Sequence, residues 1–441
     1  MAAPPASLLI RGPRIIMQDA QRRILLGDVL VEDGKIAKIG DVKGANAEET
    51  IDAKGMLLIP GLVNTHTHLP MVLLRGYGDD LPLDEWLKTR IWPAEEKMTE
   101  MDMRVGTRLA ALEMIMSGTT TFNDMYFFED AIADEADKAG LRGWAGWGMV
   151  DIGKTKGDQD PNPKIAECEA FVKKWANHPR VRGAPAPHAI YTCGPETVRQ
   201  MYAMAKRYDT VFHTHMSETR DEVYDTETKR GKRPPAVLEE WGGMGDRTVL
   251  AHCGWVTKEE IHGFAKAGAK VAHCPVSNMK LATGGAAPIP EMLAAGVAVG
   301  LGTDGAASNN TLDLFETMKV TSLLPKHMRW DARIIPAQTS FDLATRGGAA
   351  ALRLDTKVGS IEVGKQADLV LVSLRSPRMQ PLHDPVSQLV YAGHGSDVFA
   401  TIVDGRVLKL DDEYRTLKPE RVFDEAGRAA ARIIDNVGHA A

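Results

Sequence analysis

The sequence predicts an α/β fold: a (β/α)8 barrel of the TIM type, with a small β-sandwich module built from both termini. Between residues 56 and 355, short apolar runs alternate eight times with longer helix-like segments, a pattern typical of this barrel. Both flanks instead contain short strands with Asp-Gly turn signals, at Asp33-Gly34 and Asp404-Gly405. We therefore expect residues 1–55 and 356–441 to form one composite β-module, and residues 56–355 to form the catalytic barrel.

The expected elements of the barrel follow from the position of each apolar run. Strands are expected at residues 57–63, 119–123, 143–150, 181–187, 210–215, 248–252, 269–273 and 298–302. The clearest helices are expected at residues 103–116, 195–206, 234–241, 258–267 and 290–295. A last amphipathic helix is expected at residues 420–434.

Composition limits the class of partner. The 441 residues include 44% hydrophobic and 25% charged residues, which is ordinary for a globular protein. A formal net charge of −6 argues against a nucleic-acid-binding surface and favours a small-molecule partner.

Cysteine usage and apolar run length indicate the compartment. The four cysteines form no Cys-x-x-Cys pair, which is typical of a reducing environment. The first ten residues lack the basic region of a signal peptide, and no run approaches the ~20 apolar residues that cross a bilayer. We expect a cytoplasmic protein that does not interact with a membrane.

Metal-ligating side chains follow six of the expected strands. His66 and His68 stand at i and i+2 after an apolar run, so on a strand they share one face and can bind one cation. Such a pair alone is equally compatible with two ordinary surface histidines. The other strand ends carry His188, His215, His252, His273 and Asp304, in a chain with only 13 histidines. In this barrel these ends meet at one rim, where catalytic groups gather.

The same segments resemble the amidohydrolase superfamily. They are most similar to the branch of S-adenosylhomocysteine/5′-methylthioadenosine deaminases, guanine and cytosine deaminases and triazine hydrolases. The matching motifs are PGLVNTHTHLPM, LRGYGDDLPLDEWL, GTTTFNDMY, HTHMSET, LAHCGW, HCPVSNMKLATG, GLGTDGAASNN and VGSIEVGKQADLVLV, which span nearly the entire chain.

The resemblance implies a metal site made by His66, His68, His215 and Asp304. Three neutral imidazoles and one carboxylate suit a divalent cation, usually zinc and sometimes iron(II), and leave room for water. Relatives with two metals use a bridging lysine at the end of strand 4, and residues 182–188 contain none. We therefore expect one metal per chain. His213 is expected to pack beside the site or to hydrogen bond to a ligand.

The resemblance also implies the acid and base groups. Metal coordination lowers the pKa of bound water towards ~7. Glu218 is expected to take its proton and pass it to a purine nitrogen, while the metal-bound hydroxide attacks C6. Asp304 would accept the second proton, and His252 would hydrogen bond to the attacking water. Alone, Glu218 could equally be a solvated residue before an acidic helix that contains Glu222.

Substrate contacts are assigned by the same resemblance. Glu95 matches the glutamate that binds the ribose hydroxyls, and His188 matches a substrate-contacting histidine. Glu218 and Asp304 are also expected to contact the substrate, and Trp86 either stacks on it or packs within its helix. The subfamily often has an arginine after strand 3, but here Arg142 stands at the start of that strand. This departure weakens the case for a charged substrate tail.

The predicted function is hydrolytic deamination of 5′-methylthioadenosine, S-adenosylhomocysteine or adenosine to the inosine analogue and ammonia. A second hypothesis is another aminohydrolase, acting on guanine, 8-oxoguanine, cytosine or a triazine. A third is a non-catalytic metal-binding barrel, which no feature of the sequence favours. Since this branch commonly forms oligomers, a homodimer or homotetramer is expected.

Overall fold

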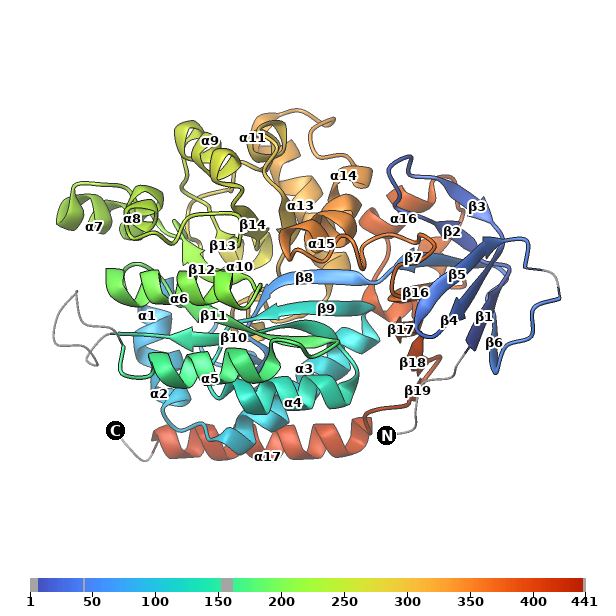
Figure 1. Ribbon diagram of the computed structural model, residues 1–441, viewed down its shortest axis with the longest axis horizontal. Helices are drawn as coiled ribbons and strands as arrows, with labels where there is room; N and C mark the ends of the chain where they lie inside the picture. The colour runs from blue at the N-terminus through green and yellow to red at the C-terminus, as the bar shows by residue number, and fades with distance from the viewer. Residues whose placement is uncertain (1–6, 43, 152–161, 439–441) are drawn as a thin grey trace.

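The computed structural model describes residues 7–42, 44–151 and 162–438 (Figure 1). The expectation about a signal peptide rests partly on residues 1–6, which lie outside this part of the chain. Eight parallel strands surround the centre of the molecule in the order β11-β10-β9-β8-β15-β14-β13-β12. They are β8 (Leu62–Thr67), β9 (Thr119–Asp124), β10 (Arg142–Met149), β11 (Val181–Pro187), β12 (Phe212–Met216), β13 (Thr248–His252), β14 (Lys270–His273) and β15 (Val299–Leu301).

Hydrogen bonds close this sheet into the predicted barrel. Leu301 of β15 lies opposite Asn64 of β8 in a parallel pair. At the junction of β11 and β12, the Thr210 hydroxyl donates to the Gly183 carbonyl at 2.9 Å. The (β/α)8 prediction is thereby confirmed.

Helices cover the outside of the barrel, and the five predicted ones are present. They are α3 (Glu100–Met116), α6 (Pro195–Arg207), α8 (Pro234–Glu240), α9 (Lys258–Ala267) and α11 (Ile289–Ala294). The others are α4 (Glu129–Ala139), α5 (Ile165–Trp175), α7 (Arg220–Arg230), α10 (Pro275–Lys280), α12 (Ala306–Asn309), α13 (Leu314–Arg329), α14 (Ala337–Asp342), η3 (Leu343–Gly347) and α15 (Gly348–Ala351). Between β8 and α3 the chain makes four short elements: η1 (Leu69–Leu74), α1 (Leu83–Trp86), η2 (Leu87–Ile91) and α2 (Trp92–Glu95).

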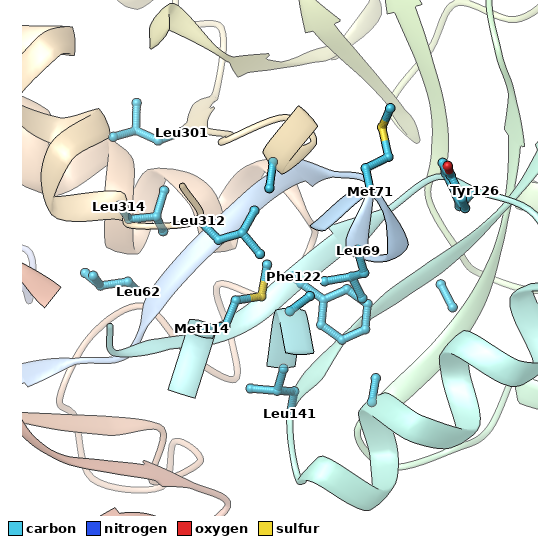
Figure 2. Close-up of a cluster of buried hydrophobic side chains, with 14 of the residues drawn as sticks. Leu62, Leu69, Met71, Met114, Phe122, Tyr126, Leu141, Leu301, Leu312 and Leu314 are labelled. Carbon is cyan, nitrogen blue, oxygen red and sulfur yellow. The ribbon is translucent and has the colours of Figure 1, made fainter. Parts of the chain in front are cut away.

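Alternating side chains of each strand build two apolar layers. Leu62 and Phe122 point outwards and pack with Met114 of α3, as Figure 2 shows. Their neighbours fill the barrel interior, where a separate cluster contains Val63, Trp144, Ala184, Val211, Val249 and Ala272. The barrel is therefore a packed core, and polar chemistry is confined to its ends.

The single strand predicted at residues 57–63 is wrong. The structure has two strands there, β7 (Met56–Pro60) and β8, with Gly61 between them. β7 pairs with β2 (Arg14–Ile16) and β16 (Leu369–Ser373) of the terminal module, whereas β8 belongs to the barrel. All eight residues from Met56 to Val63 are buried, so their hydrophobicity does not mark the change of sheet.

Both termini build a second, smaller unit beside the barrel (Figure 1). A seven-stranded sheet has the order β19-β18-β17-β16-β7-β2-β3, and a four-stranded sheet has the order β5-β4-β1-β6. Leu8 and Val29 of the smaller sheet share a buried cluster with Leu369 and Ile402 of the larger one. The remaining strands are β1 (Ser7–Arg11), β3 (Ile24–Leu26), β4 (Asp28–Glu32), β5 (Lys35–Gly40), β6 (Glu49–Asp52), β17 (Val398–Val403), β18 (Arg406–Leu410) and β19 (Glu413–Tyr414). The predicted β-module of both termini is confirmed.

The chain ends in α17 (Pro419–Gly438), which contains the predicted last helix. α17 runs along the barrel, where Arg432 pairs with Asp102 of α3 and Glu425 pairs with Arg108 at 2.7 Å. The domain limits at residues 55/56 and 355/356 stay a prediction. Within the described residues, no helix is both long and apolar enough to cross a membrane.

Candidate metal centre and substrate cavity

His66 is held by a second histidine. Its Nδ1 lies 2.7 Å from Nε2 of His213, and Nδ1 of His213 lies 3.1 Å from the Val249 carbonyl. A carbonyl only accepts, so His213 donates through Nδ1 and accepts at Nε2. His66 must then donate through Nδ1, and its own Nε2 keeps a free lone pair.

His68 and His215 are held in the same tautomer by backbone carbonyls. Nδ1 of His68 donates to the Met125 carbonyl at 2.5 Å, and Nδ1 of His215 donates to the His188 carbonyl at 2.8 Å. Each ring therefore offers Nε2 as a ligand atom, because the hydrogen bond at one nitrogen fixes the state of the other.

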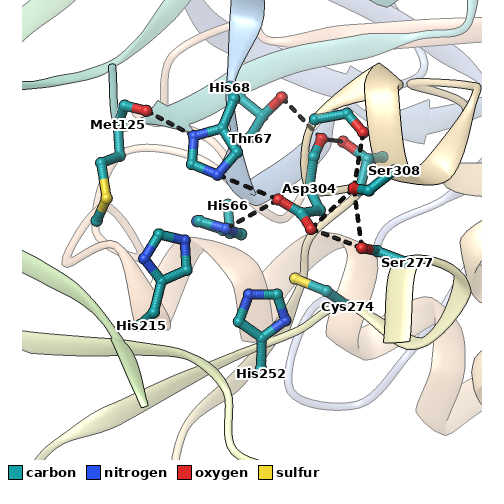
Figure 3. A network of polar contacts seen from close by, with 12 residues as sticks. His66, Thr67, His68, Met125, His215, His252, Cys274, Ser277, Asp304 and Ser308 are labelled. Atoms are coloured by element: carbon teal, nitrogen blue, oxygen red, sulfur yellow. Dashed lines mark hydrogen bonds and ion pairs between the residues drawn. The ribbon is translucent and has the colours of Figure 1, made fainter. Parts of the chain in front are cut away.

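Asp304 faces these rings from the end of β15 (Figure 3). Its Oδ1 lies 3.3 Å from Nε2 of His66 and 3.2 Å from Nε2 of His68. Its Oδ2 accepts hydrogen bonds from the hydroxyls of Ser277, at 2.6 Å, and Ser308, at 3.0 Å. Asp304 has φ 63°, a left-handed conformation that costs free energy and is held by these contacts.

The donor set fits a divalent metal. Ligand atoms of His66, His68 and His215 lie within 4.8 Å of one another, as do those of His66, His252 and Asp304. A tetrahedral zinc site, with bonds of about 2.0–2.1 Å, places its ligand atoms about 3.3 Å apart. The separations at Asp304 match that value, and Nε2 of His66 is buried without a hydrogen-bond partner. Such an atom is costly unless it binds something.

Burial sets the charge of the ligands. It lowers the pKa of His66 to about 3 and holds the pKa of His215 well below its usual value, so both rings are neutral, as metal ligands must be. Burial also lowers the pKa of His68, but donation to Asp304 and the charge of Asp304 raise it overall to about 9. A cation bound between His68 and Asp304 would replace that proton.

Glu218 and His252 stand beside the metal ligands. Nε2 of His252 lies 3.7 Å from Oε2 of Glu218, and Nδ1 of His252 lies 3.1 Å from Oδ1 of Asn278. Both side chains are buried, and burial raises the pKa of Glu218. Glu222 anchors this turn, because its carboxylate accepts the backbone N–H groups of Ser217 and Glu218 at 3.0 and 2.7 Å.

A cavity of about 660 Å³ opens above the ligands. Its lining includes all of the predicted catalytic and substrate-binding residues: Trp86, Glu95, His188, Glu218, His252 and Asp304. It also exposes His68 and His215, whereas His66 is fully buried. The structure thus brings the predicted site residues together at the carboxyl ends of the barrel strands.

The cavity lining combines a polar group with apolar side chains. Oε1 of Glu95 accepts a hydrogen bond of 2.6 Å from the Tyr126 hydroxyl, and burial raises the pKa of Glu95 to about 7. The apolar lining residues include Met71, Leu87, Ile91, Met98, Phe127 and Phe128. The cavity can therefore accept a ligand that has both polar and apolar parts.

Comparison with known proteins decides the family. The model of the Amidohydrolase family matches residues 57–408. The chain belongs to this family. It is 44% identical over 430 residues to a 5′-deoxyadenosine deaminase of Methanothermobacter thermautotrophicus, covering 97% of this chain and 99% of the relative.

Two further similarities extend over almost the whole chain. A 5-methylthioadenosine/S-adenosylhomocysteine deaminase of Desulforudis audaxviator is 43% identical over 417 residues, covering 93% of this amidohydrolase and 96% of the relative. The crystal structure of an adenosine deaminase from Xanthomonas campestris with bound zinc superposes with a TM-score of 0.92 at 35% identity, covering 98% of this chain and 100% of that one. The resemblance inferred from the motifs is confirmed.

Sequence reasoning missed several residues of this amidohydrolase site. Ser277 and Asn278 lie in the HCPVSN motif, where their place after a barrel strand was an available signal. Ser308 stands four residues after Asp304, a spacing that brings a helical side chain back over it. Lys164 follows β10 in the chain and lines the cavity. It is a cation on the segment where the subfamily often has an arginine that this sequence lacks. No pattern in the sequence marked it.

The role of His213 leads to the first prediction. Replacing His213 with leucine should weaken zinc binding by about 10- to 100-fold, because the Nδ1–H of His66 would lose its acceptor. Transfer of zinc to a chromogenic chelator measures this directly. His213→Gln supplies an amide oxygen and should restore part of the affinity, and His262→Leu, at an exposed position of α9, should change nothing. Unchanged zinc affinity in His213→Leu would show that His213 only packs.

Proposed function

We propose that this amidohydrolase is a hydrolytic deaminase that converts a 5′-deoxy- or 5′-thio-substituted adenosine, or adenosine itself, to the inosine analogue and ammonia. The observation that carries the proposal is that one cavity holds both Glu218 beside His252 and the carboxylate of Glu95. The first pair suits proton transfer at a purine ring, and the second group suits a sugar diol. The names of the relatives support the same class of substrate.

The residues divide the chemistry as follows. His66, His68, His215 and Asp304 would hold a divalent cation, which supplies Lewis-acid activation of water when bound. Oε2 of Glu218 takes a proton from the attacking water and delivers it to a purine ring nitrogen, which makes C6 electrophilic. His252 orients the water through Nε2, because its Nδ1 is engaged by Asn278. Asp304 accepts the second water proton and passes it to the C6 amino group, which leaves as ammonia.

The apolar part of the cavity lining supports a substrate with an uncharged 5′ substituent. A hydrogen or a methylthio group loses little on leaving water, whereas a phosphate would lose much there. Among the described residues that line the cavity, Lys164 is the one lysine or arginine, and it is exposed. Its charge would favour a carboxylate-bearing tail as the alternative substituent.

One divalent metal per chain, assigned as zinc, is part of the proposal. β11 ends in Pro185-Ala186-Pro187 followed by His188, so no lysine stands there to bridge a second ion. Elemental analysis of the purified protein should return one equivalent of divalent metal. Two equivalents would contradict the single-metal assignment.

A substrate panel tests the function. Wild-type protein should deaminate 5′-deoxyadenosine, methylthioadenosine or adenosine, with loss of adenine absorbance and release of ammonia. Glu95→Gln should raise KM for the nucleosides about tenfold or more, because a carboxylate that accepts from two hydroxyls is replaced by a weaker acceptor. Glu85→Gln, at an exposed position of α1, is the matched control. Turnover of only guanine, 8-oxoguanine, cytosine or a triazine would contradict the substrate assignment and keep the reaction type.

Homo-oligomeric assembly in the cytoplasm completes the proposal. Leu323, Met328 and Trp330 lie at the end of α13 with 44%, 56% and 95% of their surface exposed. Such a group of apolar side chains supports contact with a second copy. Light scattering that gave only the monomer mass would contradict this part.

A further inference from the structure

We infer that Tyr126 is a positioning residue for sugar recognition: its hydroxyl holds one oxygen of Glu95, so that the other faces the 2′- and 3′-hydroxyls of the nucleoside. This inference deepens the proposed function and rests on it. Tyr126 is 4% exposed, and its hydroxyl donates to Oε1 of Glu95 at 2.6 Å. Within the described residues, no hydrogen bond reaches Oε2 of Glu95.

The backbone of Tyr126 is fixed from both sides. Its N–H donates to the Glu129 carboxylate at 2.7 Å and approaches the Gly146 carbonyl at 3.2 Å, while its own carbonyl accepts from Gly148 at 2.8 Å. A Cβ on Gly148 would lie 2.5 Å from that carbonyl oxygen, so the contact with β10 requires glycine there. Tyr126 therefore holds its hydroxyl in place before a ligand arrives, as a positioning group must.

The same segment supports the metal site. The carbonyl of Met125 accepts the Nδ1–H of His68, and the next residue, Tyr126, holds Glu95. One rigid dipeptide thus fixes the distance between a metal ligand and the group that reads the sugar. When the sugar of a nucleoside binds at Glu95, the distance between its base and the metal ligands is therefore fixed. Binding groups remote from the reacting atoms contribute to catalysis by positioning the substrate in this way.

The hydrogen bond from the phenol favours the ionised form of Glu95, which accepts hydrogen bonds. Burial raises the pKa of Glu95 to about 7, and the hydrogen bond from Tyr126 opposes that rise. Burial raises the pKa of Tyr126 far enough that the phenol stays protonated and donates. His68, which follows β8, faces Glu95 from the barrel, and Glu96 beside Glu95 on the chain is exposed. Two hydroxyl donors need the ionised carboxylate, since a protonated acid is itself a donor.

Tyr126→Phe tests the inference on the holoenzyme. We expect KM for adenosine or methylthioadenosine to rise about tenfold, the effect of one hydrogen bond to a charged group, with kcat within a few fold. Affinity for the nucleoside should fall as the pH is lowered and Glu95 becomes protonated. In Tyr126→Phe this fall should occur at a higher pH, because Glu95 loses the hydrogen bond that lowers its pKa. Wild-type enzyme should bind 2′-deoxy- and 3′-deoxyadenosine more weakly than adenosine. In Tyr126→Phe the difference in affinity between adenosine and these two analogues should be smaller.

Controls separate positioning from general damage. Tyr224→Phe, at a 67% exposed position of α7, should leave every parameter unchanged. In a Glu95→Gln background, Tyr126→Phe should have little further effect on KM, as expected for two residues that act as one unit. The inference would be overturned if KM for the nucleoside did not change in Tyr126→Phe. It would also be overturned if kcat fell by the same factor as KM rose while the pH profile stayed unchanged. Failure of the wild type on every nucleoside would overturn the proposed function instead.

Discussion

Replacing Glu218 with glutamine should lower kcat for the nucleoside by about two to four orders of magnitude. Glutamine has the same size and keeps a polar contact with His252, but its amide can neither accept the proton of water nor deliver one to the purine. KM should change by no more than a few fold, because the loss falls on the transition state rather than on binding. Steady-state kinetics with methylthioadenosine or 5′-deoxyadenosine measure both parameters.

The interpretation depends on the metal site staying intact. Glu218 is outside the ligand set, so Glu218→Gln should retain the wild-type metal content. Glu239→Gln, at an exposed position of α8, is the matched control and should leave kcat unchanged. A fully active Glu218→Gln enzyme would refute the proton-transfer role. A variant that lost its metal would place Glu218 among the groups that support the ligands.

The barrel could be predicted because its strands are short, buried and separated by helices of recognisable period. Hydrophobicity reports burial and not the partner of a strand, which is why the sequence predicts one strand at residues 57–63 where the structure has two. The apolar run of β7 continues through Leu62 and Val63 of β8, although the two strands pair in different sheets. Burial alone does not distinguish those two sheets.

The candidate metal ligands could be proposed from the sequence because each lies at the end of a strand. Their orientation could not, since it depends on backbone carbonyls. Met125 and His188 hold two of the rings through their main-chain oxygens, which any residue would supply. Such partners leave no signature in the residue types.

Glu222 makes a contact that residue composition does not reveal. It stands in the first turn of α7, a helix rich in acidic residues. Glu222 is buried, because its carboxylate accepts two backbone N–H groups at the end of β12. Capping of this kind is read from geometry rather than composition.

Arg142 lies at the opposite end of the barrel from the cavity, and its substitution should have the largest effect on stability. Its guanidinium binds Asp368 through Nε at 2.7 Å and also contacts Asp404, so it joins β10 to the terminal β-module. Arg142 and Asp368 are 2% and 3% exposed. Arg142→Met should lower the free energy of unfolding by about 3–5 kcal/mol, because the buried Asp368 and the partly buried Asp404 would lose their counter-charge. Chemical denaturation measures the loss, and hydrogen exchange should rise first in β16 and β17.

Matched variants distinguish loss of the buried charge from loss of any ion pair. Arg333→Met removes a pair with Asp331 in which the side chains are 91% and 41% exposed, so it should leave the free energy of unfolding nearly unchanged. Adding Asp368→Asn to Arg142→Met should restore part of the stability, because it removes one of the carboxylates left without a partner. The folded variant should keep its kcat, since the network is remote from Glu218 and the metal ligands. If Arg142→Met were as stable as the wild type, the network would not be what joins the two parts of the molecule, and their shared apolar packing would be the explanation.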